Sequence, residues 1–187
     1  MCIRDRGKST VADMFERLEV PVFDADGEVR RMQGPDGALV GPIESAFPGT
    51  TGPGGVEREA LGAAVFGDPA ALARLESIVH PAVRAARAAF LRANATAPLV
   101  VFDIPLLFEK GGADEVDAVL VVSASPEVQR ARVLARPGMT AERFAQILAL
   151  QLPDAEKRKR ADYLIDTGAS LAETEAAVAA LVDKLSG

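Results

Sequence analysis

Residues that could build a disulfide framework or a zinc site are nearly absent from this chain of 187 residues. Its single cysteine, Cys2, excludes an internal disulfide, and together with the single histidine, His80, it cannot form a cysteine/histidine zinc cluster. A serine–histidine–aspartate hydrolase would depend on His80 alone. No apolar run approaches the roughly 18 residues of a membrane helix, and no signal peptide is visible. We therefore expect a soluble, cytoplasmic protein.

The composition is that of a folded domain with a surplus of negative charge. Hydrophobic residues make up 49% and charged residues 26%, which excludes intrinsic disorder and supplies a sizeable core. The net charge of −6 argues against non-specific coating of nucleic acid but leaves room for a local basic pocket. Arginine provides 16 of the 21 basic residues, and its planar fork suits phosphate groups.

Short apolar runs alternate with longer helical stretches. The runs are continuous rather than alternating, which is typical of a parallel sheet buried on both faces, and they cover residues 20–24, 99–104, 118–122 and 163–165. Helical spacing and capping residues predict helices over residues 9–18, 69–78, 81–94, 126–135, 140–152 and 170–185. Strands alternating with helices predict a doubly wound α/β fold.

The segment between the first two predicted strands is different. Residues 34–55 are rich in glycine and proline, and residues 49–55 in particular predict a loop. The residues that follow, up to about 97, are mainly helical. We interpret this segment as a helical insertion between strands rather than an independent domain.

A phosphate-binding motif stands near the start of the chain. Gly7-Lys8-Ser9-Thr10 directly precedes an amphipathic helix and matches the second half of the pattern G-x-x-x-x-G-K-[ST]. In that pattern the backbone N–H groups receive phosphate oxygens, the lysine reaches the β- and γ-phosphates, and the serine hydroxyl holds Mg²⁺. Because four residues recur by chance, an ordinary capped helix start is the alternative.

The first half of this pattern is absent. A glycine is expected five residues before Gly7, with a hydrophobic strand before it, but residues 1–6 are mostly polar or charged and contain no glycine. We expect that this leader is foreign to the protein and that the first strand is missing, which would leave the printed chain unstable and nearly inactive. The alternative is a genuine short N-terminus with no nucleotide site.

Two aspartates follow the first predicted strand. Asp24 and Asp26 stand where the carboxyl end of a parallel strand faces the ligand crevice. A carboxylate there can accept the proton of an attacking hydroxyl. The alternative is that both aspartates cap the helix that follows.

Several segments together closely resemble the dephospho-CoA kinase family, in the right order from residue 7 to about 185. They are residues 7–15, 20–26, 78–81 (Ile-Val-His-Pro), 103–109 (Asp-Ile-Pro-Leu-Leu-Phe-Glu), 129–132 with Arg136, and 165–167. The resemblance implies a P-loop kinase that transfers the γ-phosphoryl group of ATP to the ribose 3′-hydroxyl of dephospho-CoA. It implies one domain, with a core over residues 7–30, 98–128 and 161–187, a substrate-binding insertion over about 31–97 and a lid over about 129–160.

The resemblance also implies roles for individual residues in the phosphate site. Lys8 matches the catalytic lysine and Ser9 the Mg²⁺-holding hydroxyl, while Gly7 and Thr10 complete the loop. Asp103, at the end of a predicted strand, is a second candidate for the metal. Arg132 and Arg136, four residues apart, share a helix face and could converge on a polyphosphate, with Arg136 in a catalytic role. A solvated arginine face is the alternative.

On the acceptor side, Asp26 matches the proposed general base and Asp24 shapes the same pocket. His80, before Pro81 at a predicted helix boundary, is expected to contact substrate or form a structural turn rather than transfer a proton. Glu109 is expected to line the acceptor site. The ligands are then ATP, Mg²⁺ and dephospho-CoA, with neither nucleic acid nor a membrane as partner. The alternatives are another small nucleoside or nucleotide kinase and a non-catalytic nucleotide-binding module.

Overall fold

The computed structural model describes residues 6–104, 107–108, 111–135, 137–149 and 151–187. The chain divides into two compact units, one formed by Met1–Val22 with Ala97–Gly187 and the other by Phe23–Thr96. Within the described residues, no helix combines the length and apolar character that crossing a bilayer would require.

The first unit has the α/β character that the apolar runs predict. Strand β5 (Leu120–Ser123) pairs in parallel with β6 (Tyr163–Asp166). Strand β4 (Val101–Asp103) begins beside the residues that lead into β1 (Val22–Asp24), where the Val101 N–H donates to the Pro21 carbonyl at 2.9 Å. The register places Ser123 opposite Asp166, so β5 and β6 end at the same edge. The helical elements are α1 (Lys8–Arg17), η1 (Gly112–Glu115), α6 (Pro126–Leu134), α7 (Ala141–Ala149), α8 (Asp154–Lys159) and α9 (Leu171–Ser186).

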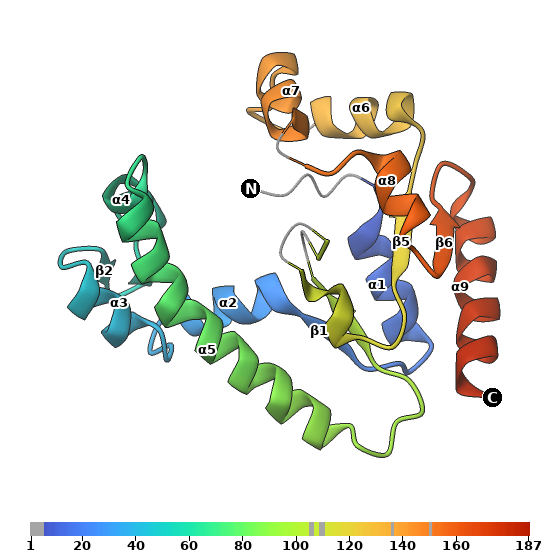
Figure 1. Ribbon diagram of the computed structural model, residues 1–187, viewed down its shortest axis with the longest axis horizontal. Coiled ribbons are helices and arrows are strands. Elements are labelled where there is room, and N and C mark those ends of the chain that lie inside the picture. Colours follow the sequence, from blue (N-terminus) through green and yellow to red (C-terminus); the bar gives the residue numbers. More distant parts are fainter. Residues whose placement is uncertain (1–5, 105–106, 109–110, 136, 150) are drawn as a thin grey trace. The chain divides into compact units, whose positions relative to one another are not determined.

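Helices α1 and α9 pack with β6 around the core of this unit, and Figure 1 shows both helices beside β5 and β6. On α1, Val11, Met14 and Phe15 follow the spacing that gathers apolar side chains on one helix face, and each is 2% exposed. They form one cluster with Val20, Ile165, Val178 and Leu181. Removing this apolar surface from water is the main stabilising contribution to the framework of α1.

Local capping explains where three helices of this unit begin. The Ser125 hydroxyl accepts from the backbone N–H of Val128 at 3.3 Å, and Thr140 accepts from Arg143 at 3.2 Å. Ser170 and Glu173 form a reciprocal capping box at α9. The predicted starts are confirmed, but α7 ends at Ala149 rather than 152. Leu152 itself stands before Pro153, and the residue before a proline disfavours helical geometry.

The second unit is mainly helical and has its own core. It contains α2 (Ala25–Gln33), α3 (Val40–Ala46), β2 (Thr51–Gly52), β3 (Gly55–Val56), α4 (Arg58–Val65) and α5 (Pro69–Ala93). The buried cluster comprises Met32, Leu39, Ile43, Phe47 and Leu61.

Residues 34–55, which are rich in glycine and proline, contain helix α3 in their middle. The prediction of a loop over residues 49–55 is wrong in part, because β2 and β3 form an antiparallel hairpin in which Gly52 faces Gly55. The Glu44 carboxylate accepts from the N–H of Gly49 at 2.8 Å and from the Thr51 hydroxyl at 2.7 Å. These contacts join α3 to the hairpin, and they come from tertiary packing rather than from local helix or strand preference.

The prediction of two helices separated at Pro81 is also wrong. Helix α5 is continuous over 25 residues and carries Pro81 in its interior. Proline cannot donate to the carbonyl of Ser77, which normally weakens a helix. Apolar side chains on both sides of the proline pack on the same core, namely Leu75, Ile78, Val79, Ala82 and Val83. The packing of these partly buried side chains holds the helix together across the missing hydrogen bond.

Candidate active site

The phosphate motif lies at the open N-terminus of α1. Gly7 precedes the helix with φ of 78°, in the left-handed region that favours glycine. A Cβ atom at this position would also lie 3.0 Å from the Thr167 side chain, so both the backbone conformation and the close contact favour glycine. Among the described residues no side chain caps α1, and its first turn carries no acidic residue. The backbone N–H groups of its first turn are therefore available to bind an anion.

Lys8 and Asp103 are brought together by the fold. Asp103 is the last residue of β4, and its carboxylate accepts a hydrogen bond from the Lys8 ammonium. The side chains are 28% and 10% exposed, respectively, so the aspartate is largely withdrawn from solvent. This contact places a carboxylate beside the helix turn that carries Ser9 and Thr10, both of which are exposed.

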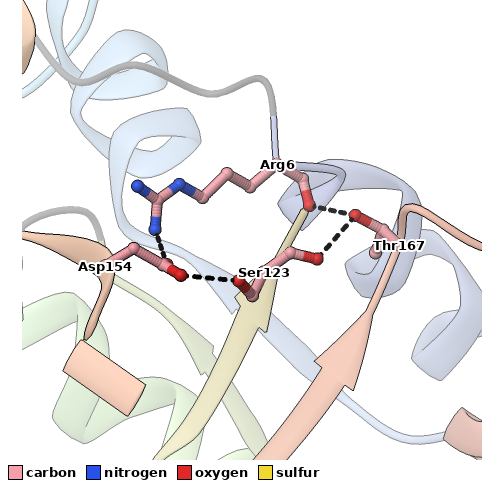
Figure 2. A network of polar contacts seen from close by, with 4 residues as sticks. All are labelled: Arg6, Ser123, Asp154 and Thr167. Carbon is pink, nitrogen blue, oxygen red and sulfur yellow. Dashed lines mark hydrogen bonds and ion pairs between the residues drawn. The ribbon is translucent and has the colours of Figure 1, made fainter. Parts of the chain in front are cut away.

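A network of polar contacts ties the entrance of the phosphate motif to the ends of β5 and β6 (Figure 2). The Thr167 hydroxyl lies 2.7 Å from the Arg6 carbonyl oxygen, to which it donates, and the Thr167 N–H donates to the Ser123 carbonyl at 2.8 Å. The Ser123 hydroxyl donates to Asp154 at 2.9 Å, and Asp154 also pairs with the Arg6 guanidinium. Four segments far apart in the sequence therefore meet next to Gly7.

Arg132 reaches the same corner from helix α6. Its Nη2 donates to the Thr167 carbonyl at 2.8 Å and its Nη1 lies 3.3 Å from the Thr167 hydroxyl. Arg132 is exposed as a residue, yet its guanidinium contacts the end of β6, so the choice between a phosphate contact and a solvated arginine face stays a prediction. Arg136 lies outside the described residues, so its convergence with Arg132 stays a prediction.

The acceptor-side candidates Asp24, Asp26 and His80 belong to the second unit. Asp24 closes β1 and pairs with Arg30 at 2.9 Å; its side chain makes no cap contact with α2, so the capping alternative is wrong for this residue. Asp26 is half-buried in the first turn of α2.

His80 is exposed in the middle of α5, so the expected helix boundary there is wrong. Glu109 lies outside the described residues.

Only a limited set of residues could hold a metal. Among the described residues, no three side chains of histidine, cysteine, aspartate or glutamate are grouped as a preformed metal cage. The Ser9 hydroxyl and the Asp103 carboxylate are hard oxygen donors of the kind that Mg²⁺ uses. Mg²⁺ commonly takes only one or two protein ligands and completes its shell with water and substrate phosphates. This donor set therefore fits Mg²⁺ held jointly with a nucleotide.

Sequence reasoning assigned no role to Ser123, Asp154 or Thr167. The available signal was their position: Ser123 and Thr167 stand at the carboxyl ends of two predicted strands. In parallel sheets such ends face the ligand. Asp154 gives no comparable signal, because its contact with Ser123 depends on how the chain returns after α7.

Comparison with known proteins agrees with the fold and the motif. A family model described as dephospho-CoA kinase matches residues 5–173. A dephospho-CoA kinase of Novosphingobium aromaticivorans is 66% identical over 94% of this chain and 88% of its own length, and one of Mesorhizobium japonicum is 55% identical over 97% and 92%. The crystal structure of TT1252 from Thermus thermophilus aligns with a TM-score of 0.83 at 37% identity, covering 98% of this chain and 94% of that one. This chain therefore belongs to the dephospho-CoA kinase family.

Proposed function

We propose that this chain transfers the γ-phosphoryl group of ATP to the ribose 3′-hydroxyl of dephospho-CoA, the last step of coenzyme A synthesis. The observation that carries the proposal is the meeting of Lys8, at the open N-terminus of α1, with Asp103 at the end of β4. Family membership supplies the acceptor. We also propose that the protein acts in the cytoplasm.

The N-terminus of α1 and two cationic side chains would bind the phosphates. The N–H groups after Gly7 present a partial positive charge to phosphate oxygens, and the Lys8 ammonium adds a full one. Arg132, directed to this corner by Thr167, and Arg136 would face the charge that develops on the γ-oxygens. Positioning and charge stabilisation supply most of the catalysis in phosphoryl transfer.

Ser9 and Asp103 would hold Mg²⁺ together with the nucleotide. When bound, Mg²⁺ neutralises phosphate charge and orients the transferring group. Ser9 contributes a neutral oxygen, while Asp103 contributes a carboxylate whose charge the Lys8 ammonium balances. Ser9 is exposed in the first turn of α1, so a ligand could reach its hydroxyl.

On the acceptor side, Asp26 would accept the proton of the ribose 3′-hydroxyl. Asp24, held by Arg30, would shape the pocket around that hydroxyl. His80 and Glu109 would contact dephospho-CoA, with the helical segment 31–97 as its binding region and residues 129–160 as a lid. A carboxylate suits the role of base because it is ionised near neutral pH.

The test is ADP release in the presence of ATP and Mg²⁺, with and without dephospho-CoA. We expect acceptor-dependent turnover that Asp26→Asn lowers by about 100-fold or more, with binding of a fluorescent ATP analogue retained. Asp36→Asn is the matched control, because Asp36 is exposed in the same unit and its φ of 57° suits asparagine equally well.

Three outcomes would contradict the proposal. Turnover with nucleoside monophosphates instead of dephospho-CoA would make the protein a different small kinase. Nucleotide binding without acceptor-dependent turnover would indicate a binding module. Equal activity of Asp26→Asn and Asp36→Asn would remove Asp26 from the reaction.

A further inference from the structure

We propose that Thr167 is a positioning residue for phosphoryl transfer, which fixes both the entrance of the phosphate motif and the direction of Arg132. This inference rests on the proposed function for its kinetic consequences, while its geometric content concerns the described residues alone. Thr167 is 5% exposed and follows the last residue of β6. Three segments of the site touch its side chain: Arg6–Gly7, the end of β5, and helix α6.

The hydroxyl of Thr167 has one proton and two neighbouring carbonyl oxygens. The Arg6 carbonyl lies at 2.7 Å and the Ser123 carbonyl at 3.2 Å. Because the Arg6 carbonyl is the nearer acceptor, at 2.7 Å against 3.2 Å, the proton is directed to Arg6, and the Ser123 carbonyl is the weaker partner. The hydroxyl thereby ties down the residue that precedes Gly7, and the partner is a backbone carbonyl that any residue at position 6 would provide.

The lone pairs of the same oxygen face Arg132. Its Nη1 lies 3.3 Å from the hydroxyl and its Nη2 donates to the Thr167 carbonyl at 2.8 Å. Donation into the hydroxyl oxygen polarises it and strengthens its own bond to Arg6. A guanidinium has five N–H donors, so contact with Thr167 through two nitrogens fixes its plane and leaves further donors for an anion.

Steric contact adds to these hydrogen bonds. The Cβ, Cγ2 and Oγ1 atoms of Thr167 all lie 3.0 Å from the place that a Cβ atom at Gly7 would take. The left-handed turn at Gly7 therefore rests directly on the threonine side chain. Since β5 and β6 form a parallel pair ending at this point, the turn is supported by a sheet edge rather than by another loop.

Thr167→Val tests this inference, because valine keeps the shape and removes the hydroxyl. We expect faster hydrogen exchange at the amide of Val11, which donates to the Gly7 carbonyl at 2.9 Å, together with weaker binding of a fluorescent ATP analogue. We also expect about a tenfold loss of kcat/KM for ATP, the factor typical of one buried hydrogen bond to a functional group. KM for dephospho-CoA should not change. Thr167→Ser, which retains the hydroxyl, should restore exchange and ATP binding.

The matched control is Thr174→Val. Thr174 is 2% exposed on α9, and its hydroxyl donates to the Ser170 carbonyl at 3.0 Å. The control should lose stability like Thr167→Val but leave exchange at the Val11 amide and ATP binding at parental values. Should Thr167→Val fail to fold, Thr167→Cys takes its place, since a thiol is only a weak donor.

Equal exchange and equal ATP binding in Thr167→Val and Thr174→Val would overturn the inference. A Thr167→Ser variant as impaired as Thr167→Val would do so too. If the parent protein shows no turnover with dephospho-CoA, the proposed function fails, whereas exchange and ATP binding still decide the role of Thr167.

Discussion

Lys8 and Asp103, which are 95 positions apart in the sequence, form an ion pair between the first residue of α1 and the last residue of β4. The Asp103 side chain is only 10% exposed, so this pair differs from a solvated surface salt bridge. Removing one partner would leave the other charge poorly compensated. The ion pair also positions the Lys8 ammonium, which is proposed to bind the phosphates of ATP.

We expect Asp103→Asn to lower kcat/KM for ATP by about 100-fold or more, in the range seen when one preorganised electrostatic contact is lost. The asparagine keeps the size of the side chain but no longer balances the Lys8 ammonium or offers a charged metal ligand. Steady-state ADP release measures the effect. Asp117→Asn, an exposed change in the same unit, serves as the control. Equal rates in the two variants would remove Asp103 from the site.

Ser9→Ala is expected to raise the Mg²⁺ concentration needed for half-maximal ADP release, because one oxygen ligand is lost while Asp103 remains. Excess Mg²⁺ should recover part of the activity. The control is Ser45→Ala, which removes an exposed hydroxyl in the second unit whose partner is the Gly41 carbonyl. A Mg²⁺ titration identical to that of the parent would contradict the assignment of Ser9.

Pro81→Ala should stabilise the second unit. Alanine restores an N–H that can donate to the Ser77 carbonyl, and it removes the clash of the proline ring. In a helix interior this exchange raises the free energy of unfolding by up to about 3 kcal/mol. Greater flexibility of the unfolded chain offsets about 0.4–1 kcal/mol of this gain. Urea unfolding followed by circular dichroism measures the difference.

The control for that experiment is Pro69→Ala at the start of the same helix, where proline costs nothing because the N–H would be unpaired anyway. A Pro81→Ala protein less stable than Pro69→Ala would mean that the ring is needed in α5.

Glu44→Gln should change the acid sensitivity of the second unit. Hydrogen bonds from the backbone N–H of Gly49 and from the Thr51 hydroxyl hold the pKa of Glu44 below its ordinary value of 4.5. A lowered pKa in the folded state means that the charged carboxylate stabilises the fold above pH 4.5 and that this stabilisation disappears as the pH falls through the folded pKa.

Thermal unfolding at pH 7 and in steps below pH 4.5 checks this prediction. The Glu44→Gln variant should have the lower Tm at pH 7, and its Tm should approach that of the parent in acid. A constant difference across this range would show that the charge of Glu44 does not matter.

Prediction from sequence succeeded where the signal was local. The apolar runs at β4, β5 and β6 and the caps Ser125, Thr140 and Ser170 place most elements of the first unit. Prediction failed at Pro81, where the structure has one continuous helix, and in part at residues 49–55, where the structure has a hairpin instead of an irregular loop. There, burial of apolar side chains on a shared core outweighs the intrinsic preference of single residues.

The sequence by itself determined that a Gly-Lys-Ser-Thr turn opens a helix, that strands end in polar residues, and which family the motifs resemble. Tertiary structure alone decided that Lys8 meets Asp103 and that Thr167 supports both Gly7 and Arg132. The physical reason is one of range. Capping and periodicity act over a few residues, whereas these contacts join distant positions. The packing of α1 against β4 brings Lys8 to Asp103, and the pairing of β5 with β6 brings Thr167 to the start of α1.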